Sequence, residues 1–153
     1  MIRPIRKLLI ANRGEIAVRI ARACFDEGIA CVAAVSEADR DSLAARLADG
    51  AVCIGPAAAS QSYLSIPAVV GAAIATGCDA LHPGYGFLSE RPELAEACAA
   101  HGLRFVGPPA SAIRRGGNKV EARRLARELG IPVGQGSDAI AEPGQALAIA
   151  AEI

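Results

Sequence analysis

The stretch HPGYGFLSE at residues 82–90 holds the residue types best suited to bind a small molecule. In it Gly84 and Gly86 flank Tyr85, in a chain with only two tyrosines and three phenylalanines. Glycine lets the backbone adopt positive φ angles and approach another group closely, so this spacing presents an aromatic ring beside an accessible backbone. The stretch is a candidate binding loop, although a glycine-rich β-to-α connection whose tyrosine covers the edge of the core has the same pattern.

Lys119 is a second candidate, because the chain has only two lysines, Lys7 and Lys119, against fourteen arginines. Asn118 before it and Glu121 after it fit a capping box, which makes Lys119 the first residue of a helix. A positive charge at that end opposes the helix dipole by about 0.3–1 kcal/mol unless an anion lies nearby. A bound phosphate and a solvated, flexible lysine both account for this residue, and both interpretations stay open.

Two common nucleotide-binding motifs do not fit the chain. The dinucleotide fingerprint needs three spaced glycines after the first strand, where only Gly14 is present. A Walker A loop needs Gly-Lys-Ser/Thr, whereas Lys119 follows Asn118 and precedes Val120. No Ser–His–Asp or Cys–His set and no carboxylate pair stands at a catalytic spacing, so we assign no catalytic residue to this chain.

Cysteine usage and charge limit the kind of protein further. The five cysteines are widely spaced, lie in apolar segments and include no Cys-x-x-Cys pair: Cys24, Cys31, Cys53, Cys78 and Cys98. We expect them to be reduced core residues, with no thiolate metal site. Sixteen basic and sixteen acidic residues cancel, which argues against nucleic acid or an anionic membrane as a partner. With no signal-peptide pattern or apolar run of about 20 residues, we expect a soluble, cytoplasmic protein.

Five short apolar runs predict strands that are buried on both faces of a sheet: 8–11, 31–35, 51–54, 79–81 and 105–106. Segments of helical periodicity separate them, so we expect an α/β fold, a Rossmann-like parallel sheet with helices on both faces. Ligands of such folds bind at the carboxyl ends of the strands. The loops at residues 12–15 and 82–90 both follow strands and should share that rim.

The first helix is predicted to be amphipathic. Ile16, Ile20 and Cys24 fall on its apolar face. The opposite face carries two pairs at i, i+4 spacing that we expect to form ion pairs: Glu15 with Arg19, and Arg22 with Asp26.

The composition changes near residue 107, after which an arginine-rich helix is expected at 120–129 and an alanine-rich helix at 142–153. Gly130 should end the first of these helices as a C′ glycine. Glu121 and Glu128 interleave with the arginines at 114, 115, 123, 124 and 127, so we interpret them as a solvated face rather than a basic patch. We expect one domain at 1–112 and the start of a second, truncated one at 113–153.

Six segments, taken in order, resemble the N-terminal domain of biotin carboxylase, the ATP-dependent component of acetyl-CoA, propionyl-CoA and pyruvate carboxylases. They are IANRGEIA at 10–17, ADRD at 38–41, SYL at 62–64, HPGYGFLSE at 82–90, FVGP at 105–108 and GSD at 136–138. The resemblance implies a pre-ATP-grasp domain over residues 1–112 and the helical beginning of an ATP-grasp domain over 113–153.

The resemblance also implies a function and its parts. The family uses MgATP to activate bicarbonate and carboxylates biotin held on a carrier domain, which then serves a carboxyltransferase. Lys119 stands where the family's lysine contacts the ATP phosphates. Tyr85, with Gly84 and Gly86 beside it, would form a wall of the biotin and bicarbonate pocket. The Mg²⁺ ligands would lie beyond this chain, which alone should be inactive, and the helix carrying Arg19 would contribute to a homodimer.

Other readings stay open because the chain departs from the family at the lysine segment. Gly116 and Asn118 replace the methionine and aspartate of the usual Met-Gly-Asp-Lys. A free-standing, non-catalytic docking or dimerisation module would tolerate these changes. Another ATP-grasp ligase, of the carbamoyl-phosphate or purine type, is the remaining alternative. The choice of the final carboxyl acceptor lies in a different domain or subunit. The sequence does not say whether a biotin carrier is fused downstream.

Overall fold

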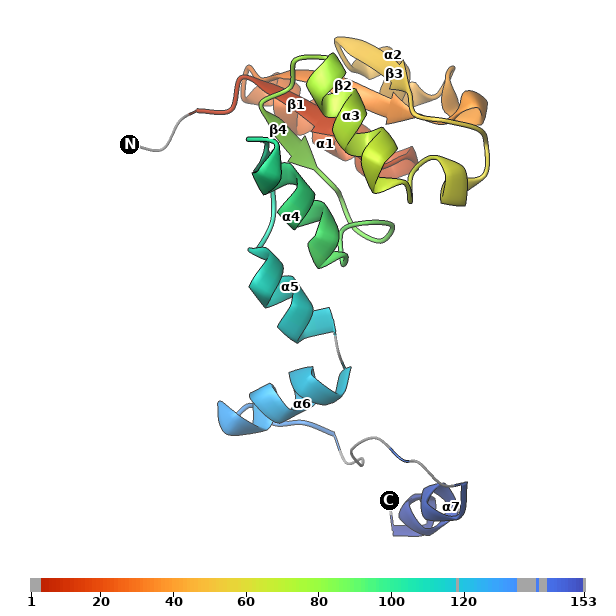
Figure 1. Ribbon diagram of the computed structural model, residues 1–153, viewed down its shortest axis with the longest axis vertical. Helices are drawn as coiled ribbons and strands as arrows, with labels where there is room; N and C mark the ends of the chain where they lie inside the picture. Colours follow the sequence, from red (N-terminus) through yellow and green to blue (C-terminus); the bar gives the residue numbers. More distant parts are fainter. Residues whose placement is uncertain (1–3, 118, 135–139, 141–142, 153) are drawn as a thin grey trace. The chain divides into compact units, whose positions relative to one another are not determined.

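The computed structural model of the protein describes residues 4–117, 119–134, 140 and 143–152 (Figure 1). The chain divides into two compact units, Met1–Ile113 and Arg114–Ile153. In the first, five strands form a sheet of order β3-β2-β1-β4-β5 in which all neighbours are parallel. The strands are β1 (Lys7–Ile10), β2 (Ala30–Val35), β3 (Gly50–Cys53), β4 (Ala80–His82) and β5 (Arg104–Phe105). The predicted parallel α/β sheet is confirmed.

Burial along the strands follows their place in the sheet. The inner strands β1, β2 and β4 consist mostly of apolar, buried residues, as their unbroken hydrophobic runs predict. In β3, half-buried and exposed residues alternate, so the expectation that residues 51–53 are buried on both faces is wrong. The reason is that β3 is an edge strand, which has a neighbouring strand on one side only. The other edge strand, β5, is half-buried, so the expectation of full burial at residues 105–106 is also wrong.

Helices cover both faces of this sheet, as predicted. On one face α1 (Gly14–Asp26) and α2 (Leu43–Leu47) pack against Leu8 and Ile10 of β1. On the other, α3 (Ile66–Ala75) and α4 (Pro92–Ala100) pack against Leu9. Because successive strand residues point to opposite faces, three consecutive apolar residues of β1 serve both cores. Two short 3₁₀ helices, η1 (Glu37–Asp39) and η2 (Ala59–Gln61), lie in the connections.

The strand order creates a switch point between β1 and β4. From β1 the chain runs outward to β2 and β3, and it then returns to place β4 on the other side of β1. The loops that follow these two neighbouring strands therefore leave the sheet together, and the Ala11 N–H donates to the carbonyl of His82 at 2.9 Å. The prediction that the loops at 12–15 and 82–90 share one rim is confirmed, at the position where such sheets bind ligands.

Helix α1 has the predicted amphipathic character but not the predicted ion pairs. Ile20 and Cys24 are buried. Among the residues that the structure describes, no ion pair within 4 Å joins Glu15 to Arg19 or Arg22 to Asp26. Glu15 instead accepts a hydrogen bond from the loop after β4, described below. Among the described residues, the predicted ion pairs therefore do not occupy the charged side chains on the polar face of α1.

The second unit contains helical segments. Helix α5 (Ala110–Gly117) leads into it, followed by α6 (Lys119–Glu128) and α7 (Pro143–Glu152). Helix α6 ends as predicted: Gly130 has a φ of 70° and the Ile131 N–H donates to the carbonyl of Ala126 at 2.8 Å. Arg124 contacts Glu121 at 2.6 Å and Glu128 at 3.8 Å, which confirms the interleaved, exposed charges at this arginine. Asn118 and the GSD segment at 136–138 lie outside the described residues.

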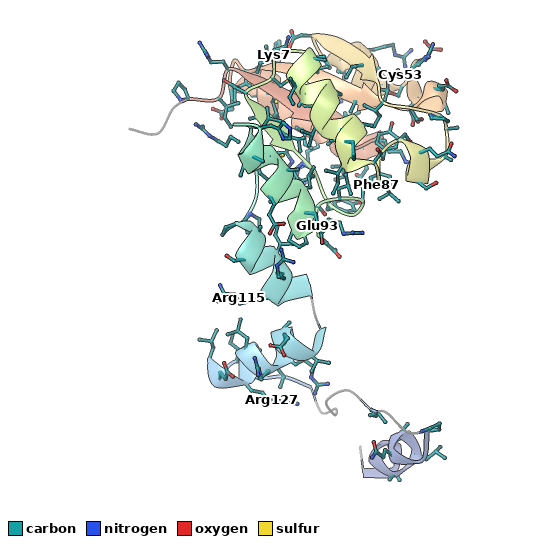
Figure 2. The ribbon with its side chains drawn as sticks, in the orientation of Figure 1. Lys7, Cys53, Phe87, Glu93, Arg115 and Arg127 are labelled. Atoms are coloured by element: carbon teal, nitrogen blue, oxygen red, sulfur yellow. The ribbon has the colours of Figure 1, made fainter. Side chains whose placement is uncertain are left out.

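The cysteines are all free thiols, and four of the five are buried. Burial raises the pKa of Cys24 and of Cys98 to about 11. Cys53 is exposed, so the expectation of a core position is wrong for this residue, which lies on the edge strand β3 (Figure 2). Within the described ranges, no His, Cys, Asp and Glu side chains form a group of three or more that could hold a metal ion. None of the helices in those ranges has the length and apolar character needed to cross a membrane.

Candidate functional site

Asn12 joins the two loops of the rim. Its side-chain amide donates to the carbonyls of Pro83 and Tyr85, both at 2.8 Å, while its Oδ1 accepts from the Arg13 N–H at 2.9 Å. Only 5% of Asn12 is exposed. A buried amide with both ends bonded is costly to disturb, because each lost partner leaves a polar group without water. The backbone on either side of Gly84 is thereby fixed to the loop after β1.

The two glycines of the HPGYGFLSE stretch have different roles. Gly84 has a φ of 67°, and a Cβ added there would lie 2.6 Å from Nδ2 of Asn12 and 2.7 Å from Cγ2 of Ile16. Gly86 has a φ of 64°, but a Cβ there would meet no atom within 4 Å. Gly84 is thus required for the close packing of the loop on α1, whereas Gly86 is required for backbone conformation only.

Tyr85 points outward from this loop. The residue is 65% exposed, and its hydroxyl donates to Oε1 of Glu15 at 3.1 Å. The hydrogen bond to Glu15, with the negative charge of that carboxylate, raises the pKa of the Tyr85 phenol. A tyrosine placed to cover the edge of the core would be buried, so the core-edge interpretation of Tyr85 does not hold. An exposed phenol held by one carboxylate is instead available to a ligand.

A largely apolar groove of about 480 Å³ lies beside Tyr85, between α1 and the end of β4. Its walls include His82, Gly84, Tyr85, Ile16, Ile20 and Val106. His82 accepts a hydrogen bond at Nδ1 from the Gly84 N–H, 3.0 Å away, and burial lowers the pKa of its imidazole. A neutral histidine that accepts at Nδ1 carries its proton on Nε2. The groove therefore combines aliphatic walls with the imidazole of His82, the phenol of Tyr85 and two charged side chains, Arg19 and Glu27.

Beyond Tyr85 the loop is held by an aromatic clamp, a name we use for Arg13, Tyr63 and Phe87. The rings of Tyr63 and Phe87 stack with centroids 5.2 Å apart and an interplanar angle of 14°. The guanidinium carbon of Arg13 lies 5.7 Å from the Tyr63 centroid and 5.4 Å from that of Phe87. Phe87, labelled in Figure 2, has a φ of 46°.

The clamp is connected to the loop after β2 through Asp39. The Tyr63 hydroxyl donates to Oδ2 of Asp39 at 2.8 Å and accepts from the Ser36 N–H at 3.1 Å. The Ser36 hydroxyl donates to the same carboxylate oxygen at 2.6 Å. Burial acts to raise the pKa of Asp39, but the bonds from Ser36 and Tyr63 and the charge of Arg13 outweigh it and lower that pKa. The loops that follow β1, β2, β3 and β4 are therefore linked.

Sequence reasoning did not single out the residues of the clamp as a group. Tyr63 and Asp39 occur in the SYL and ADRD segments, which carried the resemblance but had no assigned role. Their common signal is that each segment follows a predicted strand or precedes a helix on the same rim. The pairing of Tyr63 with Phe87, however, depends on contacts between residues 24 positions apart, which periodicity does not reveal.

Lys119 belongs to the second unit, Arg114–Ile153. It is the first residue of α6, as predicted. Its side chain and the whole of Asn118 lie outside what the structure describes, so the capping box and the phosphate contact stay predictions. Arg123 of the same helix donates to the carbonyl of Gly134 at 3.0 Å, which ties α6 to the segment after it.

A family model, curated relatives and solved structures that match this chain all belong to biotin carboxylases. Residues 4–113 match the family model for the biotin carboxylase N-terminal domain. Biotin carboxylase 1 of Bacillus subtilis is 51% identical over 150 residues, which are 97% of this chain and 33% of that protein. The chain thus spans about a third of the length of the curated relatives it matches.

Solved structures agree with the fold. The biotin carboxylase–βγ-ATP complex from Campylobacter jejuni superposes with a TM-score of 0.91 at 43% identity, covering 97% of this chain and 34% of that one. The biotin carboxylase domain dimer of Hydrogenobacter thermophilus 2-oxoglutarate carboxylase, in complex with MgADP, ADP and bicarbonate, gives a TM-score of 0.90 at 38% identity. It covers 97% of this chain and 33% of the other.

Proposed function

The chain belongs to the biotin carboxylase N-terminal domain family, and on this premise we propose that it contributes to the ATP-dependent carboxylation of biotin by bicarbonate. The observation that carries the proposal is the match of almost the whole chain, at 51% identity, to about a third of a biotin carboxylase. In this proposal the remaining two thirds supply the other parts of the enzyme. The 153 residues alone are then inactive.

We propose residues 1–112 as the pre-ATP-grasp domain and residues 113–153 as the beginning of the ATP-grasp domain. Two observations support this boundary. The family model ends at residue 113, and the structure divides between Ile113 and Arg114. The same proposal assigns the Mg²⁺ ligands to the ATP-grasp part that this chain does not include.

In the proposed enzyme Tyr85 forms a wall of the biotin and bicarbonate pocket, beside the backbone of Gly84 and Gly86. Exposure of the ring, the bond of its hydroxyl to Glu15 and the fixed backbone at Asn12 support this role. An amphipathic tyrosine fits biotin, because the bicyclic ring of biotin has apolar surface for the phenyl ring and a polar ureido group beside it. No proton transfer is assigned to Tyr85.

Lys119 is proposed to contact the ATP phosphates. Its place at the start of α6 supports this, because a cation there is disfavoured by the helix dipole unless an anion is near. The nucleotides bound to the Campylobacter and Hydrogenobacter relatives are consistent with ATP and Mg²⁺ as cofactors. When bound, MgATP would supply the phosphoryl group that activates bicarbonate.

The proposed partners follow from the family. They are a biotin carboxyl carrier domain, a carboxyltransferase and a second copy of the enzyme, in the cytoplasm. The Hydrogenobacter relative is a dimer. The open polar face of α1, which carries Arg19 and Arg22, is the proposed dimer contact.

A chimera tests the proposed function. Residues 1–153 would replace the matching third of Bacillus subtilis biotin carboxylase 1, and ATP hydrolysis would be measured with and without biotin and bicarbonate. We expect hydrolysis that depends on both substrates, and none from residues 1–153 alone. A folded, dimeric chimera without such hydrolysis would favour the docking module instead.

A further inference from the structure

Phe87 has an unusual backbone conformation for its residue type. It is the single non-glycine residue with positive φ in the described part of the chain, at 46°. Side chains with a Cβ rarely adopt this region, and such residues persist only when their surroundings hold them there. A glycine would reach the same conformation without strain. The presence of a phenylalanine therefore calls for a reason that involves its ring.

The ring of Phe87 is held on two sides. Tyr63 stacks on it almost in parallel, at 5.2 Å between centroids, and the Arg13 guanidinium carbon lies 5.4 Å from its centroid. Aromatic stacking and cation–π contacts favour this arrangement beyond the burial of apolar area. These contacts offset the backbone strain of Phe87.

Tyr63 is a firm support for that stack. It is 1% exposed, and its hydroxyl is bonded to both Asp39 and Ser36. Its ring can therefore shift only if the loop after β2 shifts with it. Through Tyr63, the position of Phe87 is thus fixed relative to the core and to the loop after β2.

Three of the four residues from Gly84 to Phe87 have positive φ, and Tyr85 is the exception. On the amino-terminal side Asn12 fixes the carbonyls of Pro83 and Tyr85. On the carboxyl-terminal side the Gly86 carbonyl accepts a hydrogen bond from the Ser89 N–H at 2.9 Å, and the clamp holds the ring of Phe87. The backbone of Tyr85 therefore lies between the hydrogen bonds of Asn12 and the stacked ring of Phe87. The exposed ring of Tyr85 is bonded to Glu15.

We propose that the aromatic clamp of Arg13, Tyr63 and Phe87 positions Tyr85, and so sets the affinity for biotin rather than for ATP. The link to biotin rests on the proposed function, whereas the link to Tyr85 rests on the contacts above. Phe87 and Tyr63 are positioning residues, because they act through the loop. Loosening the clamp lets Tyr85 sample other positions and weakens the wall that it forms.

The first measurement concerns the loop itself. Backbone ¹⁵N relaxation of Tyr85 and Gly86 would be compared in the 153-residue chain and in Phe87→Gly, Phe87→Leu and Phe87→Tyr. We expect order parameters of these two residues near 0.85 in the parent and in Phe87→Tyr, falling toward about 0.6 in Phe87→Gly and Phe87→Leu. Phe87→Leu keeps bulk and backbone strain, so it isolates the ring. Unchanged order in both would overturn the proposal.

The second measurement uses the same variants in the chimera. We expect KM for free biotin to rise roughly 3- to 10-fold in Phe87→Gly and Phe87→Leu, with KM for ATP and kcat nearly unchanged. A merely destabilised domain would lower the amount of active enzyme without this selective change. If Tyr85 loses order while KM for biotin stays constant, positioning by the clamp is supported and the proposed biotin role of Tyr85 is overturned.

Discussion

The hydroxyl of Tyr85 donates a hydrogen bond to Oε1 of Glu15 across 3.1 Å, although 70 positions separate the two residues. The bond joins the loop after β4 to the first turn of α1, on the rim where the neighbouring strands β1 and β4 end. Among the residues that the structure describes, Glu15 forms this bond and no ion pair with Arg19. It also gives the exposed phenol one fixed partner at the proposed biotin pocket.

Replacing Glu15 should change the acidity of Tyr85. Glu15→Gln removes the carboxylate that raises the Tyr85 pKa, so the phenol should ionise at lower pH than in the parent. The titration of ring-labelled tyrosines by NMR resolves Tyr85 from Tyr63, whose pKa burial raises to about 12. Glu90→Gln, which neutralises a carboxylate of the same loop, serves as the control. Identical titration of Tyr85 in the parent and Glu15→Gln would refute the interaction.

The two glycines of the loop should differ in their tolerance of alanine. Gly86→Ala adds only the strain of a positive φ, which costs about 1–2 kcal/mol of unfolding free energy. Gly84→Ala adds the same strain and forces the new Cβ against Asn12 and Ile16, so a loss of about 3 kcal/mol or more is expected. Urea denaturation of both variants measures the difference. Equal losses would show that the loop can move away from α1.

Asp39 should make stability depend on pH. Since folding lowers the pKa of this carboxyl, its stabilising effect is complete above the unfolded-state pKa of about 3.9 and is lost as pH falls through the lower folded-state pKa. Asp39→Asn should therefore be less stable than the parent at about pH 7. The difference in unfolding free energy between the two proteins should narrow by about pH 3. The control is Asp41→Asn in the same loop. A gap that does not change with pH would contradict this account of Asp39.

Lys119 should matter for ATP and not for biotin. In the chimera, Lys119→Gln should raise KM for ATP about tenfold or more, the loss expected when a charge-assisted hydrogen bond to phosphate is removed. Arg115→Gln removes a positive charge from the preceding helix and should leave KM for ATP nearly unchanged. Equal effects of the two substitutions would point to general electrostatic attraction instead of a phosphate contact.

The sequence predicts the sheet well because its strands are short, unbroken apolar runs, a pattern that belongs to buried parallel strands. It does not predict that Cys53 is exposed, because the edge position of β3 depends on the strand order, which no local pattern encodes. The rim was predictable, since the loops at 12–15 and 82–90 follow strands. The stack of Tyr63 on Phe87 was not, because it exists only once two loops have been brought together.

The same distinction explains the polar face of α1. Helical spacing predicts that Glu15 pairs with Arg19, and an isolated exposed pair of this kind contributes only about 0.3–0.5 kcal/mol. A tyrosine from a distant loop is enough to replace so weak a partner. Tertiary contacts therefore decide the bonding of Glu15, while the period of the helix decides which residues are buried.

Transfer of carbon from isotopically labelled bicarbonate to biotin by the chimera is the most direct test of the central claim. We predict acid-labile carboxybiotin that forms only with MgATP present and at a rate comparable to that of the unaltered Bacillus subtilis enzyme. A correctly folded chimera that binds ATP yet fixes no label into biotin would contradict the claim that these 153 residues serve a biotin carboxylase.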